Sequence, residues 1–68
     1  MERITKQGTA ILEAIQAAGR PLLSQEIFNI SSATVPGMGI ATVYRNIKSL
    51  LDQGAIQEVL LPGENPRY

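Results

Sequence analysis

Side chains able to bind a phosphate or a base edge gather between residues 40 and 53. Arg45 carries a planar guanidinium that can meet the edge of a guanine or a phosphate. Thr42 supplies a hydroxyl and Lys48 a point charge, and both groups suit phosphate oxygens. Apolar residues recur there at helical spacing, so the polar groups are expected on the opposite, exposed face of a helix. The apolar positions are Ile40, Val43, Ile47, Leu50 and Leu51.

Most other chemistries are removed by the composition. The chain has 68 residues with no His and no Cys, so it lacks the commonest general base, the commonest metal ligand, thiol nucleophiles and disulfides. So short a chain forms one domain at most, residues 1–68, which is too small for a deep pocket. We therefore expect a protein that is not an enzyme, with no catalytic residue, no metal site and no cofactor.

The charges balance in number but not in position. Six Lys and Arg meet six Asp and Glu, and a net charge of zero argues mildly against a nucleic-acid partner. However, the cations Arg3, Lys6, Arg45 and Lys48 fall on the N-terminal arm, the start of the first helical stretch and the third, whereas Glu13, Glu26, Glu58 and Glu64 lie elsewhere. The neutral total predicts weak, short-range binding to a polyanion.

Punctuation by Gly, Pro and capping residues predicts three helices. The first covers residues 5–18, with Thr5 as N-cap and Gly19 just past its end. The second begins at Ser24 as N-cap and ends within residues 31–39. The third covers residues 40–53 and stops at Gly54.

A short β segment completes the pattern. Residues 56–61 are expected to form a strand, residues 62–66 a turn, and residues 67–68 the start of a returning strand. Three helices followed by a hairpin is the order of a winged helix-turn-helix. We thus expect a mainly α fold with a small β-hairpin, three helices plus a truncated wing, in which the third helix is the recognition helix.

The apolar residues define an expected core and no membrane segment. The longest apolar run is three residues, 59–61, and the N-terminus has no signal-peptide pattern, so a cytoplasmic protein is expected. In the second helix, Ile30 is expected on the apolar face beside two core residues. The core is expected to contain Ile11, Ile15, Ile27, Phe28, Val43, Ile47, Leu50 and Ile56.

The third stretch also carries a recognisable motif. Residues 39–47, G-I-A-T-V-Y-R-N-I, resemble the G-[IL]-A-T-V-Y-R-x-[LI] signature of the ferric uptake regulator (Fur) family. Residues 3–7, 10–14, 21–28 and 36–39 also look like parts of that family. The resemblance covers essentially the whole chain.

This resemblance implies a DNA-reading domain of a metal- or peroxide-responsive transcription regulator. Members of the family bind AT-rich palindromes as dimers, and a second, C-terminal domain forms the dimer and holds most metal ligands. The present sequence has no His or Cys to hold a regulatory metal, so metal sensing does not transfer to it. Tight DNA binding is expected to need dimerisation or such a further domain.

The same resemblance assigns roles to single residues. It makes Tyr44 and Arg45 base-edge contacts, with the Tyr44 ring or hydroxyl near a thymine methyl or a phosphate. Position on the helix, and not the resemblance, predicts phosphate contacts for Thr42 near the helix start and for Asn46 and Lys48 on the same face, although Lys48 could instead pair with Asp52. A basic residue in the arm, Arg3, would enter a narrow minor groove.

Departures from the family pattern weaken the expected DNA contact. Gly8 stands where the family usually has Arg, and the turn after the strand carries Glu64 and no base. An alternative is therefore a winged helix used for protein contacts, as an adaptor or as a modulator of a full-length regulator. Zero net charge and the acidic turn favour this alternative, and the A-T-V-Y-R motif disfavours it.

Overall fold

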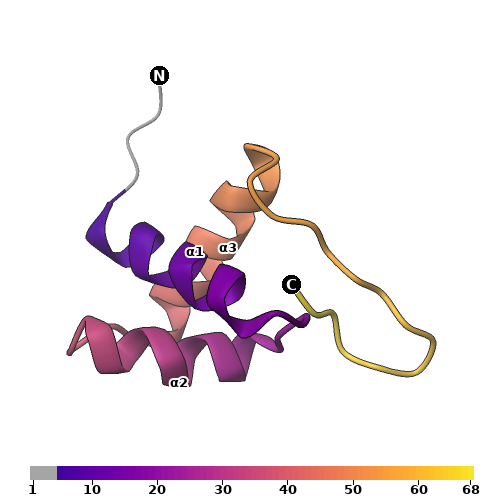
Figure 1. The fold of residues 1–68 in the computed structure, drawn as a ribbon, viewed down its shortest axis with the longest axis horizontal. Helices are drawn as coiled ribbons and strands as arrows, with labels where there is room; N and C mark the ends of the chain where they lie inside the picture. Colours follow the sequence, from indigo (N-terminus) through magenta and orange to yellow (C-terminus); the bar gives the residue numbers. More distant parts are fainter. Residues whose placement is uncertain (1–4) are drawn as a thin grey trace.

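The computed structural model describes residues 5–68, and its helices follow the three predicted stretches closely. They are α1 (Lys6–Ala18), α2 (Ser24–Thr34) and α3 (Ile40–Asp52). In Figure 1, α1 and α2 run one above the other with α3 crossing behind them, and residues 53–68 loop out to one side and return. The mainly α architecture with this helix order is confirmed.

Both ends of α1 are fixed by the residues that the sequence indicated. The Thr5 hydroxyl accepts a hydrogen bond from the backbone N–H of Gly8 at 3.1 Å, which satisfies one of the free donors of the first turn. Gly19 ends the helix in the left-handed conformation, with φ 67°, which glycine adopts without steric cost. The third helix ends similarly, because Gly54 has φ 74°.

The start of α2 differs by one residue from the prediction. Leu23 is the N-cap and Ser24 is already helical, so the prediction of Ser24 as N-cap is wrong. The Glu26 carboxylate does the capping instead, accepting the backbone N–H of Leu23 at 2.9 Å. The helix passes through Ser31, whose buried hydroxyl donates to the Ile27 carbonyl at 2.6 Å, and it ends at Thr34.

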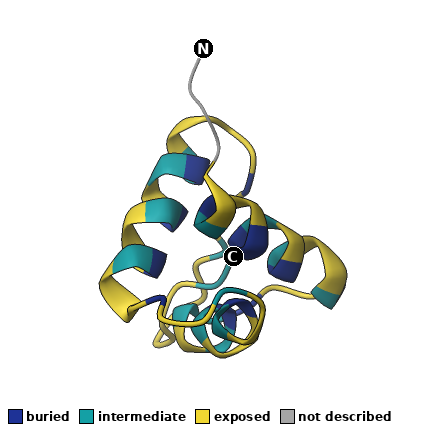
Figure 2. Ribbon diagram, turned by 90° about the vertical axis from the view of Figure 1, so that its left-hand side faces the viewer, coloured by how far each residue is buried: buried dark blue, intermediate teal, exposed yellow. Residues whose placement is uncertain are grey.

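The core lies where the three helices meet, and Figure 2 marks the buried positions of the ribbon in dark blue. Six of the eight predicted core residues are buried, whereas Ile15 and Phe28 are only partly so. Two predictions of apolar faces are wrong at single positions, because Ile30 and Ile40 are exposed. Sequence periodicity missed Leu22 and Met38, which lie in connections and yet pack in the core. The buried cluster is Ile11, Leu22, Ile27, Met38, Val43, Ile47, Leu50 and Ile56.

The predicted β-hairpin is not confirmed. Residues 56–61 form no strand, and only isolated antiparallel bridges join Val59 to Arg67 and Leu23 to Arg67. The Val59–Arg67 pair exchanges both backbone hydrogen bonds, at 2.7 and 3.0 Å. Continuing that register would pair Leu61 with Asn65, but the Glu64 N–H donates to the Leu61 carbonyl and closes a turn there. The turn ends the ladder after one pair.

The last residues nevertheless return to the core. Tyr68 exchanges two backbone hydrogen bonds with Leu22, at 2.6 and 2.8 Å, so the chain end lies beside the α1–α2 connection, as Figure 1 shows. Its hydroxyl donates to Glu58 at 3.4 Å. Partial burial, and then the negative charge of Glu58, raise the pKa of Tyr68. Residues 53–68 are thereby held to the helices at their far end.

Within residues 5–68, no helix is both long and apolar enough to span a bilayer.

Candidate nucleic-acid interface

The outward face of α3 is set by the helix's buried side. Val43, Ile47 and Leu50 are buried against α1 and α2. At 100° per residue, these positions turn the side chains of Ala41, Arg45 and Lys48 away from the core. All three are exposed. The helix therefore presents its cations to solvent on a surface that the core holds in place.

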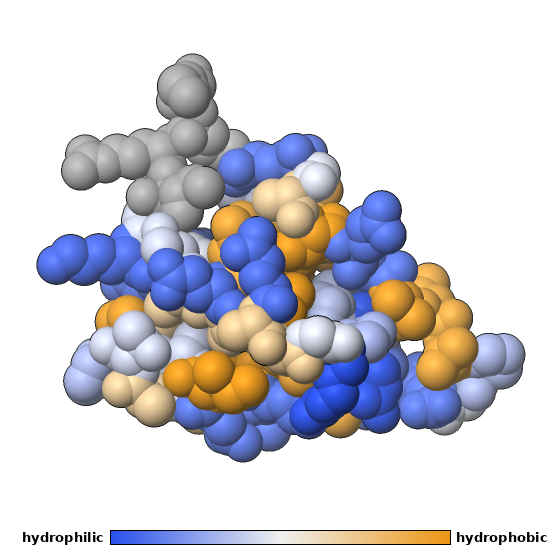
Figure 3. All heavy atoms as spheres, in the orientation of Figure 1, coloured by the Kyte–Doolittle hydropathy of each residue, from blue (hydrophilic) through white to orange (hydrophobic). Residues whose placement is uncertain are grey.

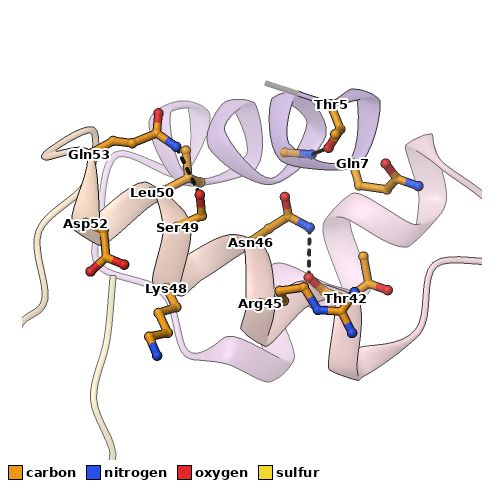
Figure 4. Close-up of a pocket in the computed structure, with 11 residues that line it drawn as sticks. Thr5, Gln7, Thr42, Arg45, Asn46, Lys48, Ser49, Leu50, Asp52 and Gln53 are labelled. Atoms are coloured by element: carbon orange, nitrogen blue, oxygen red, sulfur yellow. Dashed lines mark hydrogen bonds between the residues drawn. The ribbon is translucent and has the colours of Figure 1, made fainter. Parts of the chain in front are cut away.

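Arg45 and Lys48 are paired with no carboxylate among residues 5–68, where the ion pairs found involve only Arg20 and Arg67. The expected alternative for Lys48, an ion pair with Asp52, does not form. Figure 4 shows the Lys48 chain pointing away from α1, apart from the Asp52 carboxylate. Two positive charges thus remain available to an anionic partner.

Arg20 and Arg67 are both engaged with Glu26. Arg20 Nη2 lies 2.8 Å from Glu26 Oε2, and Arg67 Nη1 lies 3.9 Å from Glu26 Oε1. Arg67 Nη2 also lies 3.5 Å from the Glu64 carboxylate. Hydrogen bonds from Arg20 and from the Leu23 N–H stabilise the charged form of Glu26 and lower its pKa to about 2. This group, which we call the Glu26 cluster, consists of Arg20, Glu26, Glu64 and Arg67.

A polar groove of about 640 Å³ runs between the start of α1 and the adjoining side of α3. Asn46 lies between the two helices in Figure 4, where its Nδ2 donates to the Thr42 carbonyl at 2.8 Å. The Asn46 side chain is therefore tied to its own helix and only half-exposed. Thr42 is half-exposed beside it, and Gln7 of α1 also lines the groove.

The start of α3 has no side-chain cap. Its N-cap is Gly39, which has no side chain to accept a hydrogen bond, whereas the Thr5 hydroxyl caps α1. The first N–H groups of α3 therefore receive no side-chain acceptor from the cap. Such an end favours a nearby anion through the helix dipole.

Five of the six residues selected from the sequence come from α3, and the structure places them on one continuous side of it. Tyr44 is 56% exposed on the same helix, and the other four line the groove: Thr42, Arg45, Asn46 and Lys48. Arg3 lies outside the described residues. Sequence reasoning missed the exposure of Ile40, because its position fits the apolar repeat of the helix.

A regulatory metal does not fit the donors that the chain offers. The sequence lacks His and Cys, and residues 5–68 contain no group of three carboxylates close enough to hold an ion.

Comparison with known proteins assigns the chain to a family. A sequence model described as "Ferric uptake regulator family" matches residues 2–68. The chain belongs to the ferric uptake regulator family. Among curated members, a peroxide-responsive repressor (PerR) of Staphylococcus saprophyticus is 30% identical over 66 residues. That match covers 97% of this family member but only 45% of the repressor. No solved structure matches the present chain significantly.

Regulators of this family act on transcription by binding DNA. The exposed cations of α3 are therefore candidates for contact with DNA. The matched repressor is more than twice as long as the aligned part. This family member thus spans under half of that relative, and the relative's response to peroxide is a property of the longer protein.

Proposed function

We propose that this chain binds duplex DNA sequence-specifically, as the DNA-reading part of a Fur-like transcription regulator. The observation that carries the proposal is the pair of exposed cations on α3, Arg45 and Lys48, which no carboxylate of residues 5–68 neutralises. An α-helix fits the major groove, and α3 is the one whose outward face combines a guanidinium, an amine and a phenol.

Each side of α3 has a distinct role in this proposal. Arg45 and Tyr44 contact base edges in the major groove of an AT-rich site. Lys48, Thr42 and Asn46 contact phosphates, and Asn46 does so through its oxygen because its Nδ2 is bonded to Thr42. Arg3 extends from the other end of the chain into the adjacent minor groove.

The segment that returns through Val59 and Arg67 acts as a reduced wing. Its turn carries Glu64, which is paired with Arg67 rather than with any incoming group, so it adds little phosphate contact. Residues 1–68 form a single module, and one such module buries roughly 600–1,000 Å² on DNA. The isolated chain therefore binds weakly, and a dimer or a further domain strengthens binding by holding two copies together.

The test is a binding titration at several salt concentrations. The wild-type chain, Arg45→Ala and Arg3→Ala are compared on an AT-rich palindrome and on a scrambled duplex of the same composition. We expect measurable affinity at low salt, a preference for the palindrome, and loss of that preference in Arg45→Ala. No affinity of the wild type at low salt would refute the proposal, and an unchanged Arg45→Ala would refute the assignment of α3.

A second candidate function is a module for protein contacts. Leu60 is 66% exposed and Leu61 47% exposed on residues 53–68, the segment that projects from the helices. Apolar spheres mark this projecting segment in Figure 3. Two adjacent exposed leucines suit a protein surface. A chain that ignores both duplexes but changes its oligomeric state on Leu60→Ser would favour this function.

A further inference from the structure

Two large apolar side chains are exposed near the start of α3, where its apolar arc borders its cationic side. Ile40, the first helical residue, is 37% exposed, and Tyr44, four residues later, is 56% exposed. Residues four apart are neighbours on a helix surface, so the two side chains form one apolar strip. Val43 and Ile47 lie on the same helical arc as Ile40 but are buried in the core, whereas the Ile40 side chain remains partly exposed to solvent.

The surroundings of this strip indicate what covers it. Arg45 follows Tyr44 directly, and Ala41, which is small and exposed, follows Ile40. A partner that meets this face must carry negative charge for Arg45 and Lys48 and an apolar group for Ile40. In the major groove of DNA, phosphates line the edges, and the C5 methyl group of thymine is the characteristic apolar feature among the base edges.

We propose that Ile40 is a specificity-determining residue that packs against the C5 methyl group of one thymine in the major groove. This inference rests on the proposed DNA binding and adds to it a residue and an atom. Packing removes the methyl group and the isoleucine side chain from water together. Cytosine offers no methyl group at that place, so the contact favours thymine without any hydrogen bond from the protein.

Uracil isolates this contact, because it differs from thymine only by lacking the C5 methyl group. The full 68-residue chain first selects its best duplex from a random library at low salt. Each thymine of that duplex is then replaced by uracil, one at a time. We expect one replacement to weaken wild-type binding about fourfold, which is the effect of losing the burial of one methyl group.

Variants then locate the side chain that reads the methyl group. Ile40→Ala should bind the thymine and uracil duplexes equally at the sensitive position, and Ile40→Val should show an intermediate preference. Ile30→Ala is the matched control, because Ile30 is also an exposed isoleucine, 46% exposed, but lies on α2. It should keep the full fourfold preference. Circular dichroism confirms that each variant retains its helices.

The possible outcomes separate the inference from the function beneath it. If the library yields no preferred duplex, the proposed DNA binding fails and the inference fails with it. If a duplex is selected but tolerates every uracil, DNA binding stands and the methyl contact is overturned. If Ile40→Ala keeps the preference for thymine, another side chain reads the methyl group and the assignment to Ile40 is wrong.

Discussion

Arginines in two regions of this molecule are used in opposite ways. In the Glu26 cluster, Arg20 and Arg67 bind carboxylates and join the start of α2 to the returning segment. On α3, Arg45 and Lys48 have no carboxylate partner among residues 5–68. Arginines and glutamates thus form ion pairs with one another in the Glu26 cluster, whereas the two cations of α3 are not neutralised by a neighbouring carboxylate.

The contrast explains how a chain with no net charge can present a cationic surface. Net charge is a sum over the whole molecule, but an anionic partner meets only the charges that face it. In the Glu26 cluster, Arg20 and Arg67 pair with Glu26 and Glu64, so these positive and negative charges cancel one another locally. The positive charges on α3 have no such partner, and an anion that meets α3 therefore meets a cationic surface. We expect the two regions to respond to substitution in different ways, one in binding and the other in stability.

Removal of the Arg45 side chain should have the largest effect on binding. Arg45→Ala is expected to weaken binding to the preferred duplex by about 1–3 kcal/mol, the range for a bidentate contact with a base. Its melting temperature should stay close to that of the wild type, because Arg45 is exposed and joins no ion pair within residues 5–68. Fluorescence anisotropy and thermal melting measure the two quantities. A large fall in melting temperature would place Arg45 among the residues that hold the fold.

Substitution in the Glu26 cluster should show the reverse. Glu26→Gln keeps an oxygen that can accept the Leu23 N–H but loses the charge that holds Arg20 and Arg67. We expect a lower melting temperature at pH 7 and unchanged DNA affinity. A loss of affinity at temperatures where the variant is fully folded would show that the two regions are coupled.

Acid should reveal the same cluster in the wild type. The pKa of Glu26 is lowered from its usual 4.5 to about 2 in the folded chain. Because the pKa is lower in the folded chain, the ionised Glu26 carboxylate stabilises the fold above about pH 4.5, and this contribution is lost as the pH falls toward 2. The difference in melting temperature between the wild type and Glu26→Gln should therefore shrink from pH 5 to pH 2. A constant difference over that range would mean that the charge of Glu26 does not stabilise the fold.

Removal of Lys48 should have a smaller effect than removal of Arg45. A single phosphate contact contributes about 0.9 to the slope of log affinity against log salt concentration. Lys48→Ala is expected to reduce that slope by about this amount, and to weaken binding to the palindrome and to the scrambled duplex alike. Salt titrations of both duplexes test this. An effect on the palindrome alone would indicate base contact instead.

The smallest expected change comes from Asp52, the acidic residue on the outward side of α3. Asp52 forms no ion pair with Lys48, so Asp52→Asn should leave the melting temperature unchanged. Removal of one exposed negative charge near the DNA should raise affinity by roughly twofold or less at low salt, since screened surface charges interact weakly. A fall in stability would show that Lys48 and Asp52 do pair in solution.

The helices could be predicted because their signals are local. The helix ends at Thr5, Gly19 and Gly54 were predicted correctly, because each of these residues caps or ends a helix through its own conformation or a hydrogen bond three residues away. The prediction failed at Ser24, because Glu26 reached back to cap the preceding residue. It also failed for residues 56–61, because the Pro- and Gly-rich turn closes at Leu61 and stops the ladder.

The sequence predicted which residues of α3 form the candidate site but not the contacts that those residues make. Helical periodicity identified the outward side of α3, which is why five selected residues lie together. It could not show that Asn46 bonds to Thr42, that Lys48 avoids Asp52, or that Ile40 is exposed. These facts depend on rotamers and on the path of the chain before residue 40, and both are decided by tertiary packing.

The central claim is that cations on α3 serve binding whereas cations in the Glu26 cluster serve the fold. Arg45→Gln and Arg20→Gln remove the same single charge from these two regions, and the direct test measures duplex affinity and melting temperature for both. We predict that Arg45→Gln loses affinity and keeps its melting temperature, and that Arg20→Gln keeps affinity and melts at a lower temperature. Equal losses of affinity in the two variants would contradict the account, because they would show that only total charge matters.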